Sequence, residues 1–132
     1  METIKITNRA TLPILQRFTA AYKLWYGILP NVSKMSRYTL GEKVDGLFLE
    51  IMELLYVASF LSKEQKSPYL QEAIGKLDML KFFLQLGWEI KVLDNAKYVA
   101  LSEPLDEVGR MLGGWLRQVT LPPEKSSRAA VK

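Results

Sequence analysis

The sequence contains no cysteine and no histidine among its 132 residues. Without cysteine the chain has no disulfide, no thiolate nucleophile and no cysteine metal site, which suits a reducing compartment such as the cytoplasm. Without histidine it has no Ser-His-Asp or Cys-His triad, no histidine metal ligand and none of the Glu-x-x-His pairs of di-iron bundles. We therefore expect a cytoplasmic protein without a thiol- or histidine-based active site.

Other signatures of catalysis are also missing. The sequence has no glycine-rich phosphate loop, no Gly-x-Ser-x-Gly elbow and no metal-ligand cluster. Its tight acidic pairs are Glu50 with Glu53 and Asp106 with Glu107. Such pairs on helices are more often solvated charges than catalysts, so we expect no enzyme, no cofactor and no metal. A magnesium site built from carboxylates of several helices stays open as an alternative.

Long uncharged apolar runs are absent as well. Residues 1–5 lack the basic and apolar pattern of a secretory signal. The longest apolar stretch, residues 44–61, is interrupted by Asp45, Glu50 and Glu53. Charges at this spacing argue against a membrane span.

The charge distribution is uneven although the net charge is only +4. Residues 3–41 contain six basic residues and no acidic one, and residues 42–64 contain five acidic residues. A basic first third suits a polyanionic partner. The alternative is a solvated basic face that acidic neighbours offset after folding or assembly.

Hydrophobic periodicity predicts four helices at about residues 13–29, 39–65, 69–97 and 102–120. Thr39 and Glu42 match a capping box at the N-terminus of the second helix, and Ser102 is the expected N-cap of the fourth helix. The fold class is therefore all-α, an antiparallel up-and-down four-helix bundle over residues 13–120. Residues 1–12 are expected to be flexible, and residues 121–132 to be a disordered basic tail.

The third helix has apolar residues on two opposite sides. One line consists of Leu70, Ala73, Ile74, Leu77, Leu84, Trp88 and Val92. The other consists of Met79, Phe82, Phe83, Leu86, Ile90 and Leu93. One face can enter a monomer core, and the second then needs a partner, so we predict self-association. The alternative is a central helix inside a larger monomeric core.

The second helix also has apolar residues on two opposite sides, with Leu49, Tyr56 and Phe60 lying opposite its main line of apolar residues. In the fourth helix, Gly109 on the packing side predicts a close approach of its neighbour, and Trp115 is expected to lie across the adjacent surface. The predicted oligomer interface comprises Leu49, Tyr56, Phe60, Phe82, Phe83, Leu86 and Trp115.

Lys81 falls on the first apolar line of the third helix, between Leu77 and Leu84. An unpaired ammonium is costly to bury. Either its aliphatic stem carries the charge to the rim, or this line opens onto an interface or a water-filled cationic site.

Three stretches now carry a family likeness. Residues 77–84 (LDMLKFFL), 107–116 (EVGRMLGGWL) and 37–42 (RYTLGE) resemble the accessory variability determinant proteins of diversity-generating retroelements. The same stretches are similar to four-helix-bundle proteins encoded in intervening sequences of 23S ribosomal RNA genes. The likeness spans about residues 30–119, and the RMLGGW run is its most specific part.

The resemblance implies a non-enzymatic bundle that assembles as a ring-like homopentamer with a basic surface. It also implies binding to a reverse transcriptase and to RNA or DNA, in support of the mutagenic copying of a template RNA into a variable gene. The family's basic positions carry over onto Lys81, Arg110 and Arg117. With the cations of the first third, the predicted nucleic-acid-binding set is Arg17, Lys23, Arg37, Lys81, Arg110 and Arg117.

The second hypothesis is an interaction protein of the ribosomal intervening-sequence type, with a similar fold and no reverse transcriptase partner. The position of the gene separates the two hypotheses. A neighbouring reverse transcriptase gene with a repeat pair favours the first, and a position inside a ribosomal RNA gene favours the second.

Overall fold

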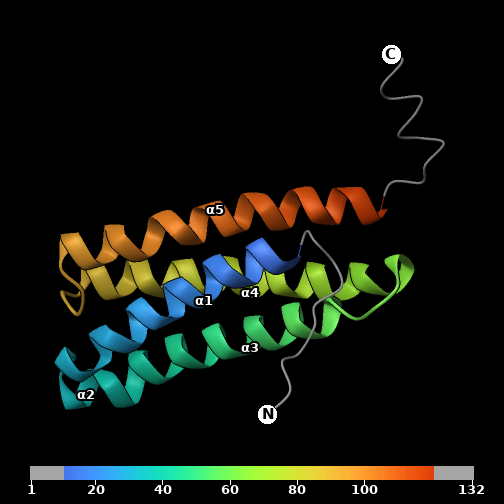
Figure 1. Cartoon of the computed structure of the whole chain (residues 1–132). Helices are drawn as coiled ribbons and strands as arrows, with labels where there is room; N and C mark the ends of the chain where they lie inside the picture. The colour runs from blue at the N-terminus through green and yellow to red at the C-terminus, as the bar shows by residue number, and fades with distance from the viewer. Residues whose placement is uncertain (1–10, 121–132) are drawn as a thin grey trace, which may run out of the picture.

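A computed structural model describes residues 11–120 and shows five α-helices and no strand within that range (Figure 1). Four of the helices are long: α1 (Thr11–Ile28), α3 (Glu42–Ala58), α4 (Lys63–Glu89) and α5 (Asn95–Thr120). Between α1 and α3 lie a 3-10 turn (η1, Leu29–Asn31), the single-turn helix α2 (Lys34–Ser36) and a π-helical turn (η2, Arg37–Gly41).

The long helices form an antiparallel bundle (Figure 1). Helix α3 packs on α1 and α4, and α5 packs on α4 and α1, so each long helix has two neighbours. The predicted all-helical bundle is confirmed. Ring-like assembly is a property of several copies and stays a prediction. None of the helices over residues 11–120 combines the length and apolarity that a membrane crossing requires.

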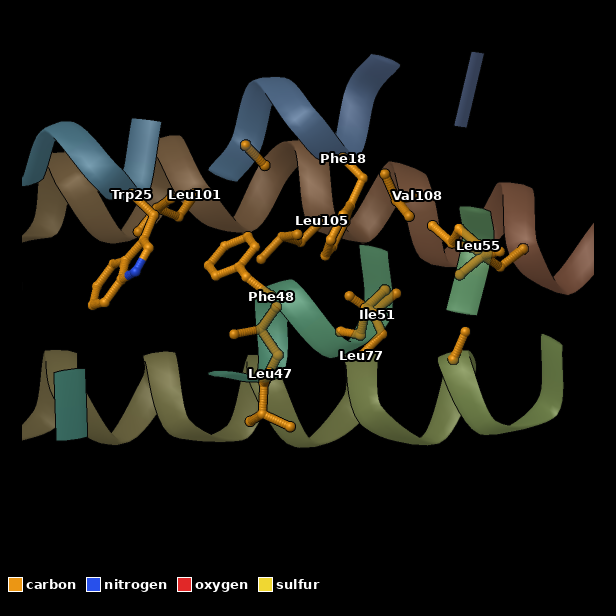
Figure 2. Packing of buried hydrophobic residues seen from close by; sticks show 14 of the residues in the cluster. Phe18, Trp25, Leu47, Phe48, Ile51, Leu55, Leu77, Leu101, Leu105 and Val108 are labelled. Carbon is orange, nitrogen blue, oxygen red and sulfur yellow. The ribbon is translucent and has the colours of Figure 1, made fainter. Parts of the chain in front are cut away.

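Aromatic side chains fill the centre of the bundle between α1 and α3 (Figure 2). The Phe48 ring centroid lies 5.4 Å from that of Phe18, 5.5 Å from that of Tyr22 and 6.2 Å from that of Trp25. Asp45 accepts hydrogen bonds from Tyr22 Oη at 2.9 Å and from Trp25 Nε1 at 3.2 Å. Burial, the hydrogen bond to Asp45 and the charge of Asp45 raise the pKa of Tyr22 to about 12. The two hydrogen bonds to Asp45 therefore fix how α1 is aligned along α3.

The turn between α3 and α4 lies at residues 59–62, earlier than predicted. Helix α4 begins at Lys63 rather than at Tyr69, because Ser62 occupies the N-cap and its backbone N–H donates to Gln65 Oε1 at 3.2 Å. Pro68 lies inside α4. Near the helix start, the proline removes one backbone hydrogen bond without ending the helix.

The turn between α4 and α5 also differs from the prediction. Helix α4 ends at Glu89, and Lys91 adopts a left-handed conformation with φ of 66°. Helix α5 begins at Asn95, where Asp94 Oδ1 accepts from the Lys97 backbone N–H at 2.8 Å, a typical N-cap bond. Ser102, the predicted N-cap, is therefore two turns inside the helix.

Thr39 is not the N-cap of the second long helix. Its Oγ1 donates to the Met35 backbone carbonyl at 2.9 Å, four residues back, because helical structure already begins at Lys34. Helix α1 begins at Thr11, inside the segment predicted to be flexible. The remaining predictions for residues 1–10 and 121–132 lie outside the described residues.

Candidate nucleic-acid interface

Three of the six predicted nucleic-acid-binding cations have partners within the chain. Arg17 on α1 forms an ion pair with Glu107 on α5. The guanidinium of Arg37 donates from Nη2 to the Val32 backbone carbonyl at 3.0 Å. Its Nε is buried and has no hydrogen-bond partner among the described residues. The Arg17 contact links α1 to α5, and the Arg37 contact links η2 to the backbone just after η1. Each contact occupies part of the guanidinium.

Lys81 is the third paired cation. Its surroundings show whether the side chain carries its charge to the rim of the bundle or lies in an interface or water-filled cationic site. Its Nζ lies 3.1 Å from Asp106 Oδ1, and its side chain is 33% exposed. The ammonium lies against Gly109, where a Cβ atom would sit 3.2 Å from Lys81 Nζ. Lys81 therefore reaches the seam between α4 and α5 and is paired there. The space beside Gly109 is thus occupied by the ends of the Lys81 and Leu77 side chains of α4.

The other three cations are exposed: Lys23 on α1, and Arg110 and Arg117 on α5. None of them forms an ion pair with another residue in the range 11–120. Arg110 and Arg117 are seven residues apart and share one helix face. Since α1 packs on α5, Arg17, Lys23, Arg110 and Arg117 all lie on this pair of helices, whereas Arg37 lies in η2.

Four of the predicted interface residues are exposed in the single chain. Leu49 is 45% exposed, Tyr56 41%, Phe60 49% and Phe82 61%. An exposed set of large apolar side chains is the expected signature of an interaction surface. The sequence-based expectation that α3 and α4 keep apolar residues outside the core is therefore met at these positions.

The remaining predicted interface residues are partly or fully covered. Phe83 and Leu86 are half-buried, and Lys43 Nζ lies 5.9 Å from the Phe83 ring centroid. Trp115 is only 4% exposed and belongs to the core. Its assignment to the interface is wrong, because it lies three residues after Leu112 on the buried stripe of α5.

The two apolar lines of α4 are divided slightly differently from the prediction. Leu80 is fully buried although neither line included it. Trp88, on the first apolar line, is 40% exposed and stacks on Tyr98 with ring centroids 5.2 Å apart. On the second line, Ile90 is 58% exposed, whereas Leu93 is buried. The chain turns away from the helix after Glu89, which folds Leu93 back onto the bundle.

Lys66 is a buried cation that the sequence analysis missed. The residue is 8% exposed, and its Nζ lies 5.3 Å from the ring centroid of Trp115. Burial lowers the pKa of Lys66 below its ordinary value of 10.5. Its spacing of four from Leu70 places it on the buried stripe of α4. That signal was missed because residues 66–68 fell between the second and third predicted helices.

Within residues 11–120, no three acidic side chains come together in a group able to hold a metal ion. The exposed arginines and lysine offer point charges and hydrogen-bond donors. Such donors suit phosphate oxygens, which they bind without reading base sequence.

Comparison with known proteins identifies the family. Residues 12–119 match the bAvd-like family, which is most of the chain and all of the long helices except the first residue of α1 and the last of α5. A search of curated proteins gives no significant match. The matched range contains the bundle, the exposed cations of α1 and α5, and the apolar faces of α3 and α4. The chain therefore belongs to the bAvd-like family.

Proposed function

We propose that this protein is a non-enzymatic accessory protein of a diversity-generating retroelement. It acts as an oligomeric basic scaffold that binds the reverse transcriptase and the template RNA or DNA during mutagenic retrohoming. The observation that carries this proposal is the bAvd-like family match over residues 12–119. Residues 77–84 and 107–116, which resemble the accessory variability determinant proteins, lie within the matched range.

The nucleic-acid contact falls on α1 and α5 in this proposal. Lys23, Arg110 and Arg117 are exposed and form no ion pair within the described residues. Contacts to phosphates release counterions, so the affinity falls steeply with salt, with a slope set by the number of phosphates neutralised. Assembly of several copies repeats these cations and makes binding multivalent.

The protein partners fall on the apolar surfaces of α3 and α4. Phe60 and Phe82 are exposed to 49% and 61% in the single chain. Burial of such aromatic side chains supplies much of the free energy of protein association. In this proposal, part of these surfaces contacts neighbouring copies in a homopentamer, and the rest contacts the reverse transcriptase.

A filter-binding titration of labelled RNA at increasing salt tests the nucleic-acid part. We expect retention at low salt, a linear fall of log affinity with log salt, and weaker retention by the R110E/R117E variant. The matched control is K34E/K63E, because Lys34 and Lys63 are also exposed and lie outside α1 and α5. Equal retention by both variants would show that α5 is the wrong surface.

Co-purification with the reverse transcriptase encoded beside the gene tests the protein part. A complex that survives nuclease treatment supports direct protein contact. Absence of the complex, together with a gene position inside a ribosomal RNA operon, would favour an interaction protein without a reverse transcriptase partner.

A further inference from the structure

An exposed tryptophan lines a pocket at the turn between α4 and α5 (Figure 1). The pocket has a volume of about 580 Å³ and is lined by Trp88, Glu89, Lys91, Leu93, Asp94 and Asn95. Trp88 is 40% exposed, whereas Trp25 and Trp115 are 1% and 4% exposed. Of the three tryptophans in the sequence, Trp88 therefore offers its ring to a ligand. We call this pocket the turn pocket.

The ring of Trp88 is held in one orientation. It stacks on Tyr98 with ring centroids 5.2 Å apart and ring planes 14° apart. Its Nε1 donates a hydrogen bond to Asn95 Oδ1. A ring fixed in this way loses little further freedom when a ligand binds. Fixed aromatic rings beside open surface are the platforms on which unpaired nucleic-acid bases stack.

The wall of the turn pocket is also built in advance. The backbone N–H groups of Val92 and Leu93 donate to the Gly87 carbonyl at 2.7 and 3.1 Å. The Leu93 side chain is only 2% exposed and belongs to the core. The turn is therefore anchored on the bundle, and the pocket exists before a ligand arrives.

Lys91 supplies a cation to this pocket at a strained position. Its φ of 66° is left-handed, a conformation in which a Cβ atom is unfavourable and glycine is the usual residue at a helix end. The chain has a lysine there, exposed and without an ion pair among residues 11–120. An ammonium group at this point can neutralise a phosphate beside the pocket.

The two carboxylates of the pocket differ in availability. Asp94 caps α5, since its Oδ1 accepts from the Lys97 backbone N–H at 2.8 Å and its Oδ2 lies 3.9 Å from Lys97 Nζ. Glu89 is exposed and forms no ion pair within the described part of the chain. It follows Trp88 directly. Glu89 is therefore the carboxylate that can accept hydrogen bonds from a ligand stacked on the indole.

We propose that the turn pocket binds one unpaired guanine base of a single-stranded nucleic acid, stacked on Trp88 and hydrogen-bonded to the Glu89 carboxylate. Lys91 contacts a phosphate of the same strand. This inference rests on the proposed function, in which the protein binds RNA or DNA through phosphates. It adds a site that reads a base, which phosphate contacts cannot do.

The chemistry of the base edges selects guanine. An ionised carboxylate only accepts hydrogen bonds, and its two oxygens suit two donors side by side. Guanine presents such a pair, N1–H and N2–H, on its Watson–Crick edge. Adenine and cytosine place a ring acceptor beside their amino group, and uracil flanks its single N–H with two carbonyls. These acceptors repel the Glu89 carboxylate, so stacking on Trp88 alone remains for the other three bases.

Fluorescence anisotropy with labelled RNA hexamers tests the base preference. The wild type should bind UUGUUU roughly tenfold more tightly than UUAUUU. UUGUUU should also quench the tryptophan fluorescence, and W88L should show no such quenching, because Trp25 and Trp115 are buried. Equal affinities for the two hexamers, or quenching that persists in W88L, would overturn the guanine site.

Three variants separate the roles of the pocket residues. W88L should weaken binding of both hexamers by roughly tenfold, because every base loses its stacking partner. E89Q should bind both hexamers within about twofold of each other, since the amide group replaces one acceptor by a donor. K91G should weaken both hexamers alike and reduce the salt slope by about one. Retained guanine preference in E89Q would overturn the role of Glu89 and with it the proposal.

Matched controls exclude unfolding and general charge effects. Y69L removes an exposed aromatic ring of α4 outside the turn pocket, and E72Q removes an exposed carboxylate of the same helix. Both should bind the hexamers like the wild type. K91G should unfold at a higher urea concentration than the wild type, because glycine adopts the left-handed conformation without strain. Its weaker binding then reports the lost cation.

Two further measurements define the ligand and separate this site from the proposed function. Guanosine monophosphate should bind at least roughly tenfold more weakly than UUGUUU, which brings further phosphates and stacked bases. Equal affinities would make the free nucleotide the ligand and overturn binding of a strand. Filter retention of long RNA at low salt is measured on the same preparation. Retention without guanine preference rejects the turn pocket alone, and guanine preference without retention rejects the scaffold function alone.

Discussion

The ammonium nitrogen of Lys81 lies 3.1 Å from Asp106 Oδ1 and joins α4 to α5 beside Gly109. The absence of a side chain at residue 109 makes room for this contact. A Cβ atom there would stand 3.2 Å from Lys81 Nζ and 3.5 Å from Leu77 Cδ2. Gly109 therefore leaves room at the α4–α5 seam for Lys81, one of the predicted nucleic-acid-binding cations.

Replacing Gly109 by alanine is expected to stabilise the fold slightly. The helix gains about 1 kcal/mol in intrinsic propensity, and displacing a partly exposed ion pair costs only about 0.5 kcal/mol. The end of a lysine side chain can move by the few tenths of an ångström required. Urea unfolding of G109A should thus give a free energy of unfolding about 0.5 kcal/mol above that of the wild type.

Gly113→Ala is the matched control, because a Cβ atom at Gly113 meets nothing within 4 Å. It should give the full propensity gain of about 1 kcal/mol. The difference between the two variants measures the cost of moving Lys81. If G109A were destabilised while G113A was stabilised, Lys81 would be held rigidly instead of being free to shift.

Asp106→Asn should release the Lys81 ammonium for binding to phosphate. The ion pair is solvent-exposed, so its loss changes the stability by less than about 1 kcal/mol. The surface loses one negative charge and gains one available cation, and the RNA affinity at low salt should rise several-fold with a steeper salt dependence. Filter binding over a salt series measures both effects.

The variant E103Q separates the two contributions to this gain. It raises the net charge by one, as D106N does, but leaves Lys81 paired, because Glu103 is an exposed residue of α5 without an ion pair among residues 11–120. If Lys81 itself contacts phosphate, D106N should gain more affinity and a steeper salt slope than E103Q. An equal gain in the two variants would mean that only the net charge had mattered and that Lys81 touches no nucleic acid.

Periodicity predicted the bundle because core residues must repeat on one face of each helix. Leu70, Leu77 and Leu84 were placed on one apolar line of the third predicted helix from spacing alone, and all three are buried. The turns were misplaced because Pro68 and Ser102 resemble helix-start signals, and both lie inside helices that Ser62 and Asp94 begin.

The candidate site was less accessible from the sequence. Pairing of Lys81 with Asp106 and of Arg17 with Glu107 depends on how α5 is aligned along α4 and α1. Helical spacing within one segment carries no information on that alignment. The burial of Trp115, by contrast, follows from helical spacing, since Trp115 lies three residues after Leu112 on the buried stripe of α5.

Replacing Lys66 by methionine should stabilise the bundle at neutral pH. Methionine has a similar length, removes the cost of burying an ammonium and gives up a cation–π contact, so we expect a net gain of about 1 kcal/mol. Burial holds the pKa of Lys66 in the folded state below its ordinary value of 10.5. The folded protein then loses this proton before the unfolded chain does, and the wild type becomes relatively more stable as pH rises toward that value.

The advantage of K66M over the wild type should accordingly shrink between neutral pH and pH 10.5. Urea titrations at a series of pH values measure this difference, and K63M at an exposed position of the same helix serves as the control. A constant advantage across the series would show that Lys66 is not desolvated in the folded protein.

Tyr22→Phe should lower stability and change its dependence on pH in the alkaline range. The hydroxyl donates to Asp45 Oδ1, and its loss costs about 1 kcal/mol, while Trp25 Nε1 continues to donate to the same oxygen. In the wild type the folded pKa of Tyr22 is raised from 10.0 to about 12, mainly by burial. The unfolded chain releases the proton first, so the contribution of Tyr22 is complete below pH 10.0 and is lost as pH rises to about 12. The difference in unfolding free energy between wild type and Y22F should therefore decrease over this interval.

Tyrosinate absorbance checks the assignment, because Y22F should lack the latest-titrating step. If that step persists in Y22F, another tyrosine carries the raised pKa and the role given to Asp45 is wrong.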